Sequence, residues 1–142
     1  MAWCDYQLPV GGEVYIYYGG YARGHKVERF TERQIGLVRM KRDRYVAREA
    51  ETDGVIRTRL LTIKGTALRL NIDASQGEAR VQMLDESGKP IPGFRFSDSS
   101  AIKVDSLDAP ITWKRSLIEV QGKPVRVEVY LHKAKLFALE VK

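Results

Sequence analysis

The chain has 142 residues, of which 44% are hydrophobic, and a net charge of +6. This length allows one domain with a real core but not two full ones, and the composition argues against wholesale disorder. The single cysteine, Cys4, excludes an internal disulfide, and no membrane-spanning run or signal peptide is encoded in these residues. We therefore expect cytoplasmic residence by default and no membrane contact, although a missing or removed upstream segment would leave the compartment open.

The first predicted strand covers residues 13–18, which are rich in β-branched and aromatic side chains. The period of two assigns these side chains to opposite faces, with Val14, Ile16 and Tyr18 on one and Tyr15 and Tyr17 on the other. A polar stretch over 21–32 follows, then a second strand over 33–40. We expect residues 1–50 to form a long N-terminal β-hairpin, which ends in a linker over 49–53.

The whole basic excess lies in one segment of this hairpin, residues 19–48. Residues 19–48 hold nine Lys and Arg against three acids, and the rest of the chain is balanced. One interpretation is an electrostatic contact surface for nucleic acid or an acidic partner; the other is a solvated loop with charged strand edges that discourage aggregation. The residues we consider for such contacts are Arg23, Lys26, Arg29, Arg39, Lys41 and Arg42.

Three clean alternating patterns predict strands in the second half of the chain. Apolar residues alternate with polar ones over 68–73, over 79–83 and over 125–132, and a further strand is expected to end the chain over 137–141. Residues 85–90 predict a turn, because Gly88 permits a positive φ and Pro90 cannot continue a ladder.

Glycines recur at nearly even intervals through this half, at Gly54, Gly65, Gly77 and Gly88. Regular turn signals between short strands are typical of sandwiches and barrels. The predicted fold is therefore all-β, with an antiparallel, jelly-roll-like β-sandwich over 51–142 preceded by the long hairpin.

No reaction is encoded in a recognisable motif. His25, His132 and Cys4 do not have the spacing of metal ligands, and no base is nominated for Cys4 as a nucleophile. Glycine pairs at 11–12 and 19–20 lack the flanking residues of a phosphate loop. We expect no metal, no cofactor and no catalytic residue.

The aromatic side chains offer the best candidates for ligand contacts. Tyr21 and His25 fall in the predicted loop beside Arg23, and a tyrosine with polar neighbours suits stacking on a sugar ring or a base. Trp113 is either a core ring or a platform on the sandwich face. The alternative for the neighbouring tyrosines is packing between sheets or across a subunit contact.

Taken together, several segments resemble the C-terminal part of five-bladed β-propeller glycoside hydrolases, the invertase- and arabinanase-like enzymes and their bacterial relatives. Residues 12–21 and 35–46 resemble the last propeller blade. The segments that resemble the C-terminal β-sandwich of that family are 70–75, 84–94, 105–106, 111–114 and 122–127.

The resemblance implies a glycosidase tail without its active site, because the family's catalytic carboxylates lie on earlier blades that have no counterpart here. We accordingly expect a non-catalytic module with a structural or interaction role, which binds carbohydrate through Tyr21, Arg23, His25 and Trp113. The alternative is a small basic β-protein that binds nucleic acid, weakly, through residues 23–48. An aromatic strand without neighbouring blades also predicts a homodimer through residues 13–46.

Overall fold

The computed structural model describes residues 2–21 and 33–142, and it divides the chain into two compact units, Met1–Arg44 and Tyr45–Lys142. The boundary therefore falls earlier than residue 50, where the sequence pattern placed it. Every strand pairing in both units is antiparallel, so the predicted all-β, sandwich-like fold is confirmed.

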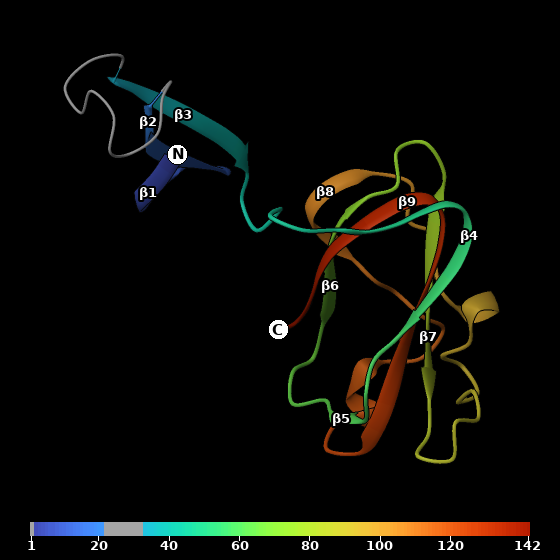
Figure 1. Cartoon of the computed structure of the whole chain (residues 1–142). Coiled ribbons are helices and arrows are strands. Elements are labelled where there is room, and N and C mark those ends of the chain that lie inside the picture. Colours follow the sequence, from blue (N-terminus) through green and yellow to red (C-terminus); the bar gives the residue numbers. More distant parts are fainter. Residues whose placement is uncertain (1, 22–32) are drawn as a thin grey trace. The chain divides into compact units, whose positions relative to one another are not determined.

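The first unit is a three-stranded sheet in the order β1-β2-β3 (Figure 1). Its strands are β1 (Ala2–Val10), β2 (Glu13–Tyr21) and β3 (Arg33–Lys41). The two strands of the expected hairpin are β2 and β3, and β1 is an additional strand that we did not predict. Gly11, with φ of 59°, allows the tight turn between β1 and β2.

The second unit is built around one long strand, β9 (Pro124–Val141), which pairs with four others (Figure 1). Its partners are β4 (Arg48–Arg57), β5 (Leu61–Thr62), β6 (Leu68–Asp73) and β7 (Glu78–Leu84). Strand β8 (Asp105–Pro110) pairs with β6, and two short 3-10 helices span Phe96–Asp98 and Leu117–Val120.

The predicted alternation in β6, β7 and β9 is confirmed by burial. Side chains at alternate positions form the core of the second unit, together with Phe94 and Ile63. The strand residues that are buried in this way are Leu68, Leu70, Ile72, Ala79, Val81, Met83, Val125, Val127, Val129 and Leu131. The turn after β7 also forms as expected, with Gly88 at φ 81° and Asp85 N–H donating to the Lys89 carbonyl at 2.9 Å.

Two expectations about this unit are wrong. Residues 49–53 are not a linker, because Ala50 pairs with Ala134 and the segment belongs to β4. The last two strands are also one strand: β9 bends at Lys133, which has φ of 45°, and its two halves pair with β7 and β6 in turn. Tertiary pairing overrides the polar, turn-like composition of 49–53.

Candidate functional site

The strand register of the first unit collects aromatic and apolar side chains on one face of its sheet. Tyr17 lies opposite Tyr6 on β1 and opposite Leu37 on β3, and residues directly opposite each other share a face. We call this surface the tyrosine face; it consists of Tyr6, Leu8, Val10, Tyr15, Tyr17, Tyr21, Ile35 and Leu37.

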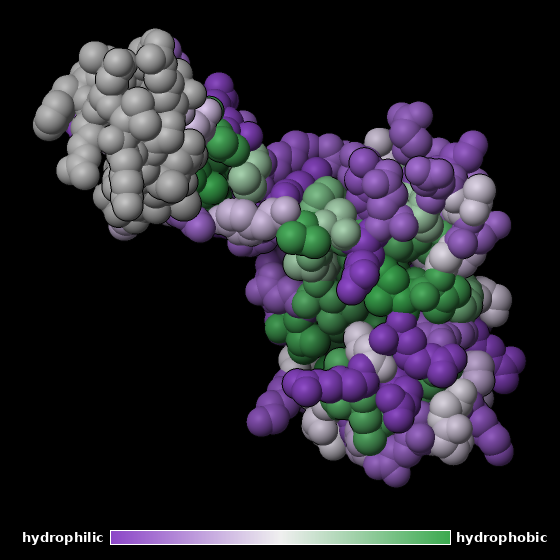
Figure 2. All heavy atoms as spheres, in the orientation of Figure 1, coloured by the Kyte–Doolittle hydropathy of each residue, from purple (hydrophilic) through white to green (hydrophobic). Residues whose placement is uncertain are grey.

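Most of the tyrosine face is open to solvent. Tyr6 is 73% exposed, Tyr17 49% and Ile35 84%, and the other aliphatic members lie between 42% and 44%. Apolar side chains normally reach a monomer surface singly, whereas a contiguous group marks an interaction site. In the view of Figure 2, hydrophobic atoms reach the surface of both units among hydrophilic ones.

Charged side chains flank the tyrosine face at both ends of β3. The Arg39 guanidinium lies 5.0 Å from the Tyr15 ring centre and bonds to Glu13 through Nη2 and Oε2 at 2.7 Å. This hydrogen bond holds the pKa of Glu13 below its ordinary value and raises the pKa of Arg39. At the opposite end, the Arg33 guanidinium lies 5.5 Å from the Tyr21 ring centre. These cations stack on aromatic rings of the tyrosine face and add positive charge to it.

The opposite face of the same sheet is better covered. Val14 is only 5% exposed and Ile16, Tyr18 and Met40 are half-buried, but Val38, opposite Ile16, is 41% exposed. The predicted separation of Val14, Ile16 and Tyr18 from Tyr15 and Tyr17 is therefore confirmed by the register. Coverage of both faces, which the apolar composition favoured, is therefore only partial on this side and lower still on the tyrosine face.

The residues predicted to contact ligands fall into three groups. Arg23, His25, Lys26 and Arg29 lie outside the described residues. Arg39 is on the tyrosine face, Lys41 ends β3 on the same side, and Arg42 pairs with Asp43 at 3.7 Å. Tyr21 belongs to the first unit and Trp113 to the second, so each is described with its own surroundings.

Trp113 is a half-buried ring packed on the core of the second unit. Its Nε1–H donates to the Val81 carbonyl at 2.8 Å, and its ring lies 5.7 Å from that of Phe94. One side of the residue still lines a hollow of about 220 Å³, together with Thr66, Thr112, Arg115 and Ser116. The ring is thus fixed by the core and lines a hollow whose walls combine these polar side chains with apolar ones.

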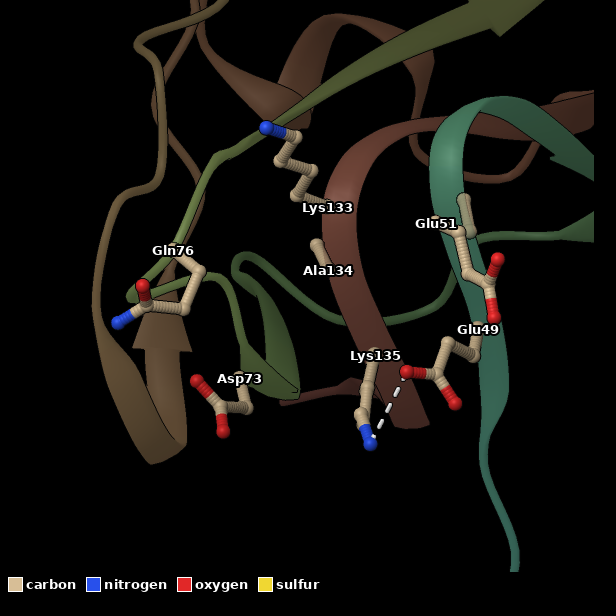
Figure 3. A pocket seen from close by; sticks show the side chains of 8 residues that line it. Glu49, Glu51, Asp73, Gln76, Lys133, Ala134 and Lys135 are labelled. Carbon is tan, nitrogen blue, oxygen red and sulfur yellow. Dashed lines mark ion pairs between the residues drawn. The ribbon is translucent and has the colours of Figure 1, made fainter.

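A second hollow, of about 260 Å³, lies where β9 bends (Figure 3). Its rim carries charges of both signs, and Lys135 Nζ pairs with Glu49 Oε1 at 3.0 Å. The side chains that line it are Glu49, Ala50, Glu51, Asp73, Gln76, Lys133, Ala134 and Lys135. These side chains include no nucleophile that is paired with a base. The hollow is therefore lined by solvated charged groups of the kind found on ordinary protein surfaces.

Polar side chains on β4, β9 and β7 also form two neighbouring hydrogen-bonded groups. Asp53 Oδ1 accepts from Tyr130 Oη at 2.5 Å and lies 2.9 Å from His132 Nδ1. The hydrogen bond from Tyr130 is the main cause that lowers the pKa of Asp53, and the same bond raises the pKa of Tyr130. Next to it, the buried Glu128 carboxylate accepts from Arg57 at 2.6 Å and from Gln82 at 2.5 Å.

Within the described part of the chain, no three His, Cys, Asp or Glu side chains gather as metal ligands. Nor does any described helix have the length and hydropathy to cross a bilayer. Comparisons of the chain with protein-family models, with curated proteins and with solved structures find no match.

Sequence reasoning missed three members of the tyrosine face, Tyr6, Leu8 and Val10. The signal for them was present, because apolar residues alternate with Gln7 and Pro9 over 6–10. It was weak because Pro9 cannot donate to a ladder and argues against a central strand. In the structure β1 is an edge strand, where proline is tolerated.

Proposed function

We propose that the chain is a non-catalytic interaction module in which the tyrosine face docks on the surface of another polypeptide. The observation that carries this proposal is the exposure of six large apolar side chains on one side of a three-stranded sheet. A sheet needs a second layer to bury its apolar face, and this one leaves that face in solvent. The second unit has a hydrophobic core of its own, and in this proposal it is the folded scaffold to which the docking sheet is attached.

The resemblance to the tail of propeller glycoside hydrolases is consistent with this role. An antiparallel meander such as β1-β2-β3 is the kind of element from which propeller blades are made, and blades are stabilised by packing against neighbours. The proposal therefore treats the first unit as a layer that is completed by another protein surface.

Hydroxyl-radical footprinting with mass spectrometry tests whether the tyrosine face is available. Tyr17 and Tyr45 are matched reporters, because they are 49% and 48% exposed and belong to different units. In dilute protein we expect both to be oxidised at similar rates, with Tyr6 faster than either. If Tyr6 and Tyr17 are protected in dilute monomer while Tyr45 reacts, the face is covered by its own chain and the proposal fails.

A second candidate function is carbohydrate binding at the Trp113 hollow. It is favoured by one observation, an aromatic ring fixed by the core beside hydroxyl and guanidinium groups, which is a suitable arrangement for stacking and hydrogen bonding to a sugar. Titration of a Trp3→Phe variant with soluble glycans, followed by the fluorescence of Trp113, tests it. A response that persists in Thr66→Arg, where the hollow is filled, would contradict binding at this place.

A further inference from the structure

We propose that the partner of the tyrosine face is a second copy of this chain, and that two tyrosine faces pack against each other in a closed, two-fold dimer. This inference rests on the proposed function, since it names the surface on which the module docks. Two-fold packing is isologous, so each residue of the face contributes to both halves of the interface. The result is a small sandwich made of two three-stranded sheets, whose faces lie about 10 Å apart.

The apolar area that the tyrosine face offers is close to what such a dimer needs. Tyr6 and Tyr17, with 73% and 49% of their surfaces exposed, together offer roughly 200–300 Å² of surface to bury. Leu8, Val10, Ile35 and Leu37 add on the order of 100–250 Å². A stable homodimer buries about 800 Å² per partner, of which about 65% is apolar. The face therefore supplies roughly 300–550 Å² of apolar area, which approaches the about 520 Å² that such a dimer needs per partner.

The position of the charges completes the layout of an interface. Tyr6, Tyr17 and Leu37 form one row across the middle of the sheet, whereas Glu13 and Arg39 lie toward one end and Arg33 at the other. An apolar centre with a charged rim is the arrangement found in protein interfaces. Arg39 stays paired with Glu13 at the rim, so no isolated charge has to be buried.

The sign of the rim charge distinguishes a second copy from a polyanion. Among the described residues of each face, the three cations Arg33, Arg39 and Lys41 outnumber the one carboxylate, Glu13. Two such faces repel each other at long range, and salt screens this repulsion, with a Debye length of about 8 Å at physiological ionic strength. Dimerisation should therefore strengthen as salt is added. Binding of a single-stranded nucleic acid to the same tyrosines and cations would weaken steeply under the same change.

Sedimentation equilibrium of the full chain over a range of concentrations is the test, with the variants Ile35→Lys and Val55→Lys. Ile35 is on the tyrosine face and Val55 is on β4 of the second unit; both are exposed strand aliphatics, and both variants add the same charge. We expect a micromolar dimer that Ile35→Lys weakens at least tenfold and Val55→Lys leaves unchanged, with wild-type association tighter at about 0.5 M than at about 0.05 M salt. Circular dichroism establishes that both variants keep their strands.

Three outcomes overturn the inference. The first is a monomer at about 100 µM, and the second is a dimer that Val55→Lys weakens as much as Ile35→Lys does. The third is association seen only with a single-stranded oligonucleotide and lost on adding salt, which assigns the face to nucleic acid. Footprinting separates this failure from that of the proposed function: a monomer with reactive Tyr6 and Tyr17 still offers a docking face, and a monomer with both protected does not.

Discussion

The ring of Tyr18 lies directly over Gly36 on the neighbouring strand, where the two residues are paired in register. A Cβ at position 36 would overlap the outer end of that ring, so glycine here makes room for an aromatic side chain. A strand glycine covered by a cross-strand aromatic is a recognised way to stabilise a sheet. This contact lies on the side opposite the tyrosine face, where side-chain packing between the strands stabilises the sheet of the first unit.

Gly36→Ala should therefore destabilise the first unit by about 1–2 kcal/mol, because the Tyr18 ring must swing away from its place. The matched control is Gly20→Ala, on the adjacent strand, where a Cβ would make ordinary contacts at 3.8 Å and 3.9 Å. Amide hydrogen exchange of β2 and β3 measures the change locally, whatever the second unit does. Equal effects of the two substitutions would mean that the ring contact contributes nothing.

Asp53→Ala should lower the pKa of Tyr130 toward that of free tyrosine. In the structure the Asp53 carboxylate accepts a hydrogen bond from the Tyr130 hydroxyl, which favours the neutral phenol and raises its pKa. A pH titration of Tyr130 followed by NMR measures this, and Glu49→Ala on the same strand is the control. A Tyr130 titration unchanged in Asp53→Ala would contradict the hydrogen bond.

The same hydrogen bond makes the stability of the fold depend on pH. The folded-state pKa of Asp53 is lowered, so its contribution is present above the unfolded value, near 3.8, and is lost as pH falls through the folded value. At neutral pH the wild type should therefore have a higher free energy of unfolding than Asp53→Asn. This difference should shrink as the pH falls below 3.8. Urea unfolding at several pH values checks the sign.

Gly77→Ala should be the most disruptive single methyl addition at the bend of β9. A Cβ there would overlap the backbone carbonyl of His132, which cannot swing aside as a flexible side chain can. We expect a loss of about 3 kcal/mol of unfolding free energy, measured by urea titration. Gly54→Ala is the control, because its Cβ would meet a methyl group, that of Ala50, at 3.2 Å.

The bend carries a second, opposite prediction at Lys133. A lysine with φ of 45° is in a region that favours glycine, and relief of the strain is worth about 1 kcal/mol after the entropy cost of glycine is subtracted. Lys133→Gly should thus stabilise the second unit slightly, whereas Lys135→Gly should destabilise it, because glycine costs entropy in a regular strand and the exposed ion pair with Glu49 is also lost. A loss of stability in both variants would show that the backbone at 133 is not strained.

The alternating sequence patterns predicted the core strands because one face of each is buried. Leu70, Val81 and Val129 all lie inside, as the period of two required. The strand over 49–53 could not be read in this way, since its hydrogen bonds are made by distant residues on β9. The continuity of β9 could have been predicted, because no glycine or proline interrupts 125–141.

The sequence predicted only part of the tyrosine face. The alternation over 13–18 placed Tyr15 and Tyr17 together, and it is the pairing with β1 that turns two tyrosines into a surface. Pairing of strands is a tertiary property, which local periodicity does not specify. The same holds for the cluster of Asp53 with Tyr130 and His132, which joins two strands from opposite ends of the second unit's sequence.

Association with nucleic acid should be weak and strongly salt-dependent if it occurs. The described cations of the first unit include Arg39, which is already paired with Glu13, and Arg42, which pairs with Asp43, so part of the basic excess is neutralised within this unit. Contacts to phosphates release counterions and give a steep loss of affinity with ionic strength, and no base-reading motif is present.

Fluorescence anisotropy with labelled single-stranded oligonucleotides of several sequences, from about 0.05 to 0.2 M salt, measures both properties. Glu13→Gln releases Arg39 from its partner and should tighten this binding, whereas Glu140→Gln makes the same charge change in the second unit and should not. Sequence-specific binding that survives at the higher salt would instead identify the basic hairpin as a nucleic-acid site.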